Sequence, residues 1–494
     1  MHSKRLTIAA LSLGSVAAAY DWSTFAINNN EWHETIERDV CIVGGGSSGV
    51  HAAVQLKDLN RTVAIVERKS VLGGHTNTFT EPETLAHVDY GVLVFHPLSV
   101  TYDYFGRFDI PLFNLTYAKP NEPGQPCNKS LPYLLCKTTR SVIDFRDGSP
   151  VNTTKYTDFS EARERYIKAT SQYPYLLDGY DIPDPVPEDL YMPFGDFVEK
   201  YSLQAIFSTA YLTAQGLGDM LHVPAIYAIK YFNTIDAQTL VGSSYVTTVR
   251  RSTYELYEKA GKFIGKDNLF MDSSIISTRR QNTTSGRLEL LITSKDQSLS
   301  LLSCRQVIST IPPQVSNLDG WDLSDDETSV FSKFTKSNGY WAGLVTNVGL
   351  NQTRSWLNAA ANTPFNIPVL PAMYEFRPIG VVEGLWAVKF AANTAAMTDE
   401  QVKDYVIRQI QTIQKSVGAP VTEPRWVAFD SHSPFSLYTS PEDIKHGFYK
   451  SLNGLQGGFG GKMFYSGAAF HVHNSAMLWR YNQEVLIPQM RRSW

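Results

Sequence analysis

Three glycines near the start of the chain have the spacing that binds the phosphates of a dinucleotide. Gly44, Gly46 and Gly49 follow the apolar run at residues 40–43 and lead into the helical pattern GVHAAVQL. In a G-x-G-x-x-G turn the first glycine allows a tight bend, the second lets a pyrophosphate approach, and the third lets helix and strand pack closely. Ser48 completes the contacts predicted for this turn, and the helix N-terminus directs free N–H groups at the phosphates.

An acidic residue stands where a ribose would be held. A second β-branched run, TVAIV at residues 62–66, ends at Glu67. An acid about 20 residues beyond the glycine turn is the usual partner of the ribose hydroxyl groups. Strand, turn, helix, strand and acid together predict a dinucleotide site. The alternative is a glycine-rich turn in an ordinary βαβ unit.

The chain shows one such fingerprint rather than two. The tract LNGLQGGFGG at residues 452–461 follows no clear strand and opens no helix. An enzyme that binds both a flavin and a nicotinamide nucleotide usually carries two fingerprints. A single N-terminal fingerprint suits a flavin protein that takes electrons directly from its substrate.

The segment after Glu67 carries a resemblance to a known family. Gly73 and Gly74 can bring backbone N–H groups to the pyrophosphate, and His75 follows them. Fingerprint, acid and GG pair resemble the flavin-containing amine oxidase superfamily, in which an arginine normally stands in place of His75. The stretches VLGGHT and VDYGVLVFH look closer to one branch, the beta-cyclopiazonate dehydrogenase family. Its members are FAD-dependent oxidoreductases, typically of fungal secondary metabolism, so the resemblance implies FAD as the cofactor.

The resemblance also implies roles for two distant segments. FMDSSI resembles the adenine-side strand of the superfamily, where the backbone of Ile275 would contact the adenine. YSGAAF resembles the segment that crosses the ribityl chain, which implies cofactor contacts at Gly467 and Ala468. A helix that begins after Asn474, a good N-cap, would direct its positive end at the flavin and favour hydride acceptance.

Four histidines are the titratable groups nearest to the inferred flavin. A histidine can titrate near neutral pH and can take a proton while a hydride leaves the substrate. We expect His75 to contact the cofactor, and His96 and His471 to face the substrate as catalytic groups. The alternative for each of them, and for His473, is a hydrogen-bonding spacer of the cofactor.

The sequence departs from the amine oxidase pattern in the substrate domain. In those enzymes a lysine often begins a strand and holds a water beside the flavin. Here Tyr340 and Trp341 occupy the matching place, and Lys336 lies upstream. This difference disfavours classical amine or amino-acid oxidation. Arg377 could act as a carboxylate clamp, but we interpret it as a surface charge.

The expected fold is α/β, with a Rossmann-like FAD-binding domain of the GR2 type and a discontinuous α+β substrate domain. Apolar spacing at residues 156–233 predicts a helical insertion over the substrate side of the flavin, or else a plain structural bundle. Residues 245–264 predict one further helix. The predicted division is a signal peptide at residues 1–19, an FAD-binding domain at 37–100, 240–315 and 455–494, and a substrate domain at 101–239 and 316–454.

Residues 1–19 have the layout of a secretory signal, because basic residues precede a short apolar run and a small-residue cleavage site. We expect a secreted or secretory-pathway protein without a membrane span.

Cys127 and Cys136 could pair in an oxidising lumen, whereas Cys41 and Cys304 are expected to be inert core thiols. No Cys/His spacing resembles a metal site. We expect N-glycosylation at some of the sequons, which are at Asn60, Asn114, Asn128, Asn152, Asn282 and Asn351.

Composition narrows the function further. The 494 residues carry a formal net charge of −4 without a long run of like charge, so nucleic acid is not an indicated partner. Aromatic residues make up 12%, which suits a large apolar pocket but is equally explained by packing in the core. We predict an FAD-dependent dehydrogenase or oxidase that oxidises a C–H or N–H bond of a hydrophobic natural product, with ring closure as a further outcome. The alternatives are a secreted amine or amino-acid oxidase that produces peroxide, and a flavin-stabilised binding protein without turnover.

Overall fold

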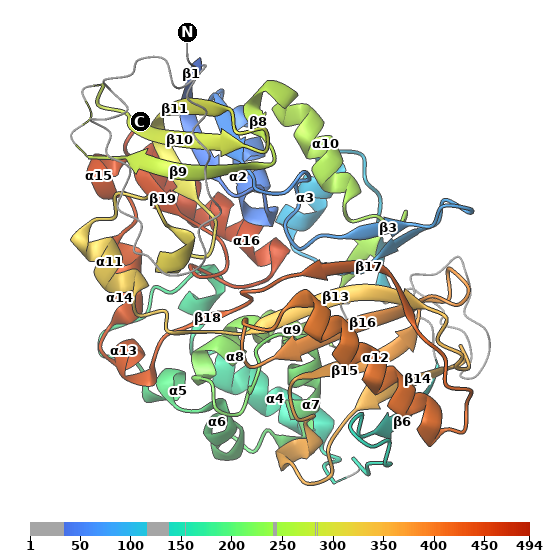
Figure 1. The fold of residues 1–494 in the computed structure, drawn as a ribbon. Coiled ribbons are helices and arrows are strands. Elements are labelled where there is room, and N and C mark those ends of the chain that lie inside the picture. Colours follow the sequence, from blue (N-terminus) through green and yellow to red (C-terminus); the bar gives the residue numbers. More distant parts are fainter. Residues whose placement is uncertain (1–33, 116–137, 154, 241–244, 282, 284) are drawn as a thin grey trace, which may run out of the picture.

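The computed structural model describes residues 34–494, except residues 116–137, 154, 241–244, 282 and 284. The predicted signal peptide and the cysteines at positions 127 and 136 lie outside these residues. Figure 1 shows an upper lobe built around one sheet and a lower lobe that combines a second sheet with a group of helices. Each of the two large sheets draws strands from distant parts of the chain.

A seven-stranded sheet forms the upper lobe. β1 (Glu34–Val43) lies at its centre and runs parallel to β2 on one side and β11 on the other. Parallel strands are usually covered on both faces, which explains why residues 40–43 at the end of β1 and all four residues of β2 are apolar and buried. The other strands are β8 (Leu269–Phe270), β2 (Val63–Val66), β11 (Leu299–Ser309), β10 (Leu288–Ser294), β9 (Ser273–Arg279) and β19 (Met463–Tyr465), which pairs with β11.

Three helices pack together against this sheet. α2 (Ser47–Asp58) begins at the glycine turn and contacts both α10 (Glu255–Ile264) and α16 (Ser475–Tyr481). The helix predicted at residues 245–264 is present only in its second half, as α10. The first half contains β7 (Val246–Thr248), which pairs with a strand upstream in the chain. All three residues of β7 are β-branched, which favours a strand over a helix.

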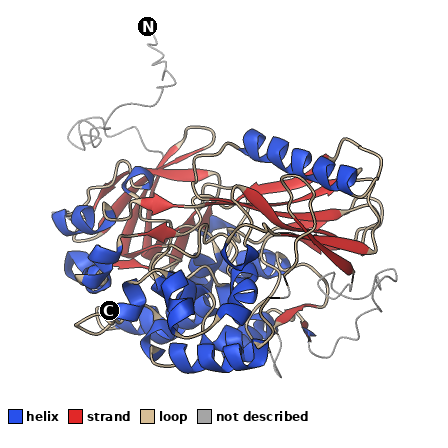
Figure 2. Ribbon diagram, turned by 90° about the horizontal axis from the view of Figure 1, so that it is seen from below, coloured by secondary structure: helices blue, strands red, loops and turns tan. Residues whose placement is uncertain are grey.

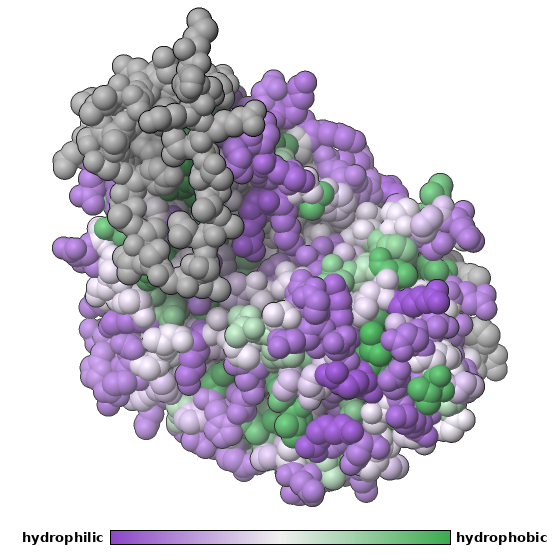
Figure 3. All heavy atoms as spheres, viewed as in Figure 1, coloured by the Kyte–Doolittle hydropathy of each residue, from purple (hydrophilic) through white to green (hydrophobic). Residues whose placement is uncertain are grey.

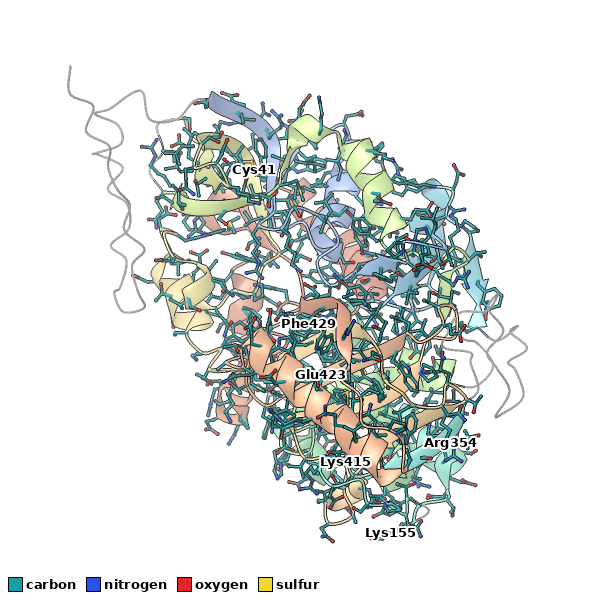
Figure 4. All side chains as sticks on the ribbon, turned by 45° about the vertical axis from the view of Figure 1, so that its right-hand side comes forward. Cys41, Lys155, Arg354, Lys415, Glu423 and Phe429 are labelled. Carbon is teal, nitrogen blue, oxygen red and sulfur yellow. A yellow bond between two sulfur atoms is a disulfide. The ribbon has the colours of Figure 1, made fainter. Side chains whose placement is uncertain are left out.

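A six-stranded sheet forms one wall of the lower lobe. Its strands in spatial order are β17 (Arg425–Ser431), β13 (Gly339–Thr346), β16 (Trp386–Ala392), β15 (Ala372–Pro378), β14 (Arg354–Asn358) and β6 (Thr139–Ile143). α12 (Asp399–Ser416) lies across the outer face of this sheet. In Figure 4 the helix is found by the label of Lys415, near its C-terminal end, and the neighbouring β17 by the label of Phe429. Because side chains alternate along a strand, the other face of the sheet is directed into the protein.

Helices fill the rest of the lower lobe, where the helical pattern predicted them. Figure 2 shows most helices on one side of the sheets, while a long helix covers the opposite side. The helices of this group are α4 (Phe159–Thr170), α5 (Glu188–Tyr191), α6 (Phe194–Lys200), α7 (Gln204–Thr213), α8 (Ala225–Tyr231) and α9 (Thr234–Thr239). The remaining elements are β3 (Thr78–Thr80), β4 (His87–Asp89), α3 (Ser99–Arg107), β5 (Leu112–Asn114), α11 (Asp325–Phe331), β12 (Lys336–Ser337), β18 (Leu437–Tyr438), α13 (Pro441–Lys445), α14 (Phe448–Gly454), α15 (Gly458–Gly461) and α17 (Ile487–Arg491).

The outer surface mixes polar and apolar side chains. On the face in Figure 3, hydrophobic residues (green) are interspersed among hydrophilic ones (purple) over both lobes. Among the described residues, no helix combines the length and the apolarity that crossing a membrane requires.

A disulfide joins Cys41 on β1 to Cys304 on β11. The expectation that these two residues are inert thiols is therefore wrong. Both side chains are fully buried between neighbouring strands of the upper sheet, a position that pattern alone does not distinguish from that of core thiols. Figure 4 shows Cys41 inside the upper lobe. The bond crosslinks the strand that leads into the glycine turn.

Candidate active site

A cavity of about 740 Å³ lies between the two lobes. At one end its wall is formed by the glycine turn, the end of β2, the GG segment and the starts of β9 and α16. At the other end the wall is formed by the inner face of the six-stranded sheet and by residues of the helical group. The volume lies within the range usual for small-molecule and cofactor sites. Nucleotide-binding elements and a substrate-sized space therefore share one cavity.

The glycine turn has the shape that a pyrophosphate needs. Gly44 adopts a φ of +106°, and a Cβ on Gly49 would lie 2.0 Å from the carbonyl oxygen of Gly44. Gly49 does not line the cavity and instead lets α2 pack on the turn, whereas Gly44 and Gly46 line it. Gly46 caps α2 without a side-chain hydrogen bond and no acid occupies the first turn, so the helix N-terminus remains suited to an anion.

The neighbouring contacts also fit a dinucleotide. The Glu67 carboxylate lies at the end of β2, where it accepts hydrogen bonds from the backbone N–H groups of Gly45 (2.7 Å) and Lys69 (2.8 Å). Gly74 lies so close to Gly46 that a Cβ on it would be 3.0 Å from the Gly46 Cα atom. Glu67 places a carboxylate where the ribose of FAD would lie, and Gly46 and Gly74 leave room for the pyrophosphate because neither has a side chain.

The other predicted cofactor residues all line the cavity, but the side chain of Ser48 is bonded away from it. Gly73, Gly74, His75, Ile275, Gly467 and Ala468 all line the cavity. Ser48 also lines it, but its hydroxyl shares a hydrogen bond of 2.7 Å with the hydroxyl of Ser466 and donates to Asn482. The Ser48 side chain thus connects the turn to β19 and the C-terminal helices, and only its backbone is positioned for the phosphates.

Aromatic and imidazole rings stack along the middle of the cavity wall. The ring of His75 lies parallel to that of His432, with centroids 4.2 Å apart, and His473 stacks on Phe435 at 4.0 Å. Burial lowers the pKa of His75 and His432, and it lowers that of His473 to about 3. The three imidazoles are therefore uncharged at neutral pH. His432 was not predicted, because it follows β17 without a recognisable motif.

His96 lines the cavity and contacts a buried carboxylate. Its Nε2 lies 2.8 Å from Oδ1 of Asp236, and its Nδ1 lies 3.0 Å from the side-chain amide nitrogen of Asn474, the N-cap of α16. Burial alone would lower the pKa of His96, but the charge of Asp236 and the hydrogen bonds from both partners raise it. Tyr245 also donates its hydroxyl to Asp236. Asp236 thus favours the protonated form of His96, and His96 also contacts the N-cap of α16.

Replacing Asp236 by asparagine is expected to lower the pKa of His96 below its ordinary value. The substitution removes the negative charge, and the burial that disfavours the imidazolium remains. A histidine-selective NMR titration of the flavin-loaded protein measures this change. Asp219→Asn is the matched control, because Asp219 pairs with His222, whose side chain is 78% exposed and lies outside the cavity. An unchanged His96 titration in Asp236→Asn would contradict the assignment.

His471 is placed differently from the prediction. It does not line the cavity, and its Nδ1 accepts a hydrogen bond from the buried Lys230. The Lys230 Nζ also donates to the carbonyl oxygens of Leu176 and Gly179. His471 therefore connects the C-terminal segment to the helical group behind the wall. This position does not match a substrate-facing catalytic role.

The inner face of the six-stranded sheet contributes charged residues, of which only Arg377 was considered from the sequence, as a possible carboxylate clamp. Glu375 and Arg377 on β15 and Lys389 on β16 all line the cavity. The Arg377 side chain is only 14% exposed, so the interpretation of this residue as a surface charge is wrong. Tyr340 lines the cavity, whereas Lys336 is exposed on β12 and is absent from its wall. A lysine does reach the substrate space, but from a strand next to the expected one.

Comparisons with known proteins agree with this geometry. Residues 42–108 match the family described as NAD(P)-binding Rossmann-like domain. The FAD-dependent oxidoreductase oblC of Cochliobolus heterostrophus is 32% identical over 498 residues, which cover 98% of this chain and 98% of that protein. The FAD-dependent oxidoreductase pigF of Monascus ruber is 33% identical over 490 residues, with 98% of each covered. Beta-cyclopiazonate dehydrogenase of Aspergillus oryzae is 33% identical over 471 residues, with 93% and 94% covered.

Solved structures share the fold at lower identity. A fatty acid isomerase from P. acnes that produces CLA superposes with a TM-score of 0.67 at 17% identity, covering 91% of this chain and 98% of that one. A triple mutant of putrescine oxidase gives 0.62 at 13% identity, covering 93% and 100%. The sequence relatives match along nearly the whole chain, including both lobes that form the cavity. The chain therefore belongs to the beta-cyclopiazonate dehydrogenase family and is an FAD-dependent oxidoreductase.

Proposed function

We propose that the enzyme oxidises a C–H or N–H bond of a small, largely hydrophobic metabolite. The observation that carries this proposal is the continuity of the cavity, which runs from the dinucleotide turn to a space walled by aromatic residues such as Tyr231, Tyr340 and Phe435. FAD, when bound, accepts the hydride equivalent that the substrate loses. A wall of aromatic side chains favours a flat apolar molecule and excludes water from the reacting bond.

The cavity residues have separate roles in this proposal. The glycine turn, Glu67 and the GG segment bind the dinucleotide, and Gly467 and Ala468 approach the cofactor through their backbone. The uncharged ring stack of His75, His432 and His473 supplies a rigid surface beside the substrate space. His96 retains a proton shared with Asp236 and orients α16, whose N-terminus carries the positive end of the helix dipole.

Anaerobic mixing tests the proposed activity. The flavin-loaded enzyme is mixed without oxygen with hydrophobic metabolites from the organism that encodes it, and the absorbance of oxidised flavin is followed. Bleaching by one of them is the expected result, and peroxide release in air would then identify an oxidase rather than a dehydrogenase. Shifts of the flavin spectrum without bleaching by any compound would contradict the proposal and favour a non-catalytic binding protein.

An amine oxidase is the second candidate function. The carboxylate of Glu375 lines the cavity, where it could pair with a substrate ammonium group. The fold shared with putrescine oxidase is compatible with an amine oxidase. At 13% identity, however, the similarity concerns the fold and says nothing about the substrate. Bleaching by aliphatic amines, with no bleaching by neutral or acidic metabolites, would favour it.

We further propose that the protein passes through an oxidising compartment. The Cys41–Cys304 disulfide supports this, because such bonds persist mainly in the secretory pathway and outside cells. The sequon residues Asn60, Asn152 and Asn351 are exposed and therefore open to glycosylation. A change of electrophoretic mobility after glycosidase treatment of the protein from its native host tests the proposal.

A further inference from the structure

We propose that the substrate carries a delocalised oxyanion, such as a carboxylate, and that Arg377 and Lys389 bind it at the sheet wall of the cavity. The inference rests on the proposed function, since it assigns the substrate class of the same site. It depends on three observations, namely the register of two strands, the surroundings of Lys389 and the placement of the charged groups along the cavity.

The two cations share one face of the sheet. β15 and β16 are antiparallel neighbours, and Arg377 lies opposite Ala387, two residues from Lys389 along β16. Side chains two apart on a strand point to the same side, so Ala387 and Lys389 both line the cavity beside Arg377. The alternate residues Phe376 and Val388 pack in the core under α12. The sheet therefore holds both cations on a rigid support, which favours a defined binding geometry.

The ammonium group of Lys389 is fixed at the cavity wall by two hydrogen bonds. Its Nζ donates to the carbonyl oxygens of Tyr90 (2.7 Å) and Gly91 (2.9 Å), two of the three bonds that an ammonium group can donate. No acceptor for a third is recorded among the described residues. Burial lowers the pKa of Lys389 to about 8, and Glu375 and Asp89 act against that shift. An oxyanion in the cavity would supply the third acceptor and would stabilise the charged form.

The other basic groups along the cavity are paired with an acid, uncharged or at its dinucleotide end. His96 is paired with Asp236, and Lys69 at the cofactor end lies 3.0 Å from Asp430. Arg68 lies at the dinucleotide end of the same cavity, and the stacked histidines of the wall are uncharged.

At the substrate end the cavity is lined by two cations, Arg377 and Lys389, and by the carboxylate of Glu375. The closest approach of Glu375 to Arg377 is 3.9 Å, between Oε1 and Nη1. Asp89 also acts electrostatically on Lys389, but burial raises the pKa of Asp89 to about 7, so its carboxyl carries only part of a negative charge near neutral pH. A planar guanidinium matches the two oxygens of a delocalised anion, and a lysine adds a point charge, which together favour a carboxylate over a neutral group.

Three probes that differ in one functional group test the inference. The flavin-loaded enzyme is titrated with 3-phenylpropanoate, 3-phenylpropanamide and 3-phenylpropylamine, and binding is read from the perturbation of the flavin spectrum without turnover. We expect the acid to bind at least about tenfold more tightly than the amide, the effect of one charge-assisted hydrogen bond. Lys389→Met and Arg377→Met should each weaken binding of the acid toward that of the amide and leave the amide unchanged.

Controls separate recognition from folding. Lys450→Met removes a lysine whose side chain is 73% exposed and lies outside the cavity, and it should leave all three affinities unchanged. Lys389→Arg and Arg377→Lys keep the charge and should restore part of the preference for the acid. Flavin content and circular dichroism show whether each variant is folded.

Several outcomes would overturn the inference. Equal affinities for the three probes, or no spectral change with the acid up to its solubility limit, would show that the wall does not select an anion. Tightest binding of the amine, lost in Glu375→Gln, would replace it by recognition of an ammonium group. If the acid is preferred but no metabolite bleaches the flavin, the inference stands and the proposed oxidation fails, so the two failures remain distinguishable.

Discussion

Replacing Gly49 by alanine is expected to abolish FAD binding. The new Cβ would lie 2.0 Å from the carbonyl oxygen of Gly44, far inside van der Waals contact, and 3.1 Å from the Cγ2 atom of Ile42, which is a tight contact. The first of these atoms belongs to the backbone and cannot rotate away, so α2 must shift outward from the turn. That shift removes the helix N-terminus from the phosphates. The measurement is the flavin-to-protein ratio of the purified variant, which we expect to fall close to zero even after reconstitution with added FAD.

Gly106→Ala is the matched control for this prediction. Gly106 lies on the exposed side of α3, and a Cβ there would meet no atom within 4 Å. Alanine favours a helix over glycine by up to about 1 kcal/mol, so this variant should keep its flavin and gain slightly in stability. A normal flavin content in Gly49→Ala would show that the turn tolerates a displaced helix, and it would contradict the proposed packing role of Gly49.

The dinucleotide end of the site could be predicted because its signals are local. The three glycines, the acid at the end of the next strand and the GG pair each occupy short segments with a fixed order and spacing. The same is true of Asn474, whose side chain accepts a hydrogen bond from the Met477 N–H group and caps α16 as expected. Such patterns depend on the backbone of a few consecutive residues. They therefore remain readable when the rest of the fold is unknown.

The substrate end could not be predicted in the same way. Lys389 and Arg377 reach the cavity because two antiparallel strands pair in one register, and a shift of one residue would direct both side chains at α12. Nothing in the local sequence sets that register. His471 shows the reverse case of a residue that was predicted to face the cavity but does not. It lies near the cofactor segment in the sequence, yet its side chain contacts Lys230 behind the cavity wall. Proximity in sequence is a weak guide to which side of a wall a residue occupies.

Removing the Cys41–Cys304 disulfide is expected to lower the free energy of unfolding by about 2–4 kcal/mol, the usual contribution of such a bond. The two cysteines are 263 residues apart, so the bond greatly restricts the unfolded chain. The measurement is denaturant unfolding of the Cys41→Ala/Cys304→Ala variant beside the wild type.

A reducing agent supplies the internal control for that comparison. It should destabilise the wild type but change the double variant much less, because the variant no longer has this bond to lose. Mass spectrometry of an unreduced digest should show the two cysteine peptides joined, and free thiols at both positions would contradict the assignment. Because the bond crosslinks β1 directly before the glycine turn, its loss should also weaken FAD retention. A wild-type protein made in a reducing compartment should then resemble the double variant in both stability and flavin content, which connects the site of folding to the activity of the enzyme.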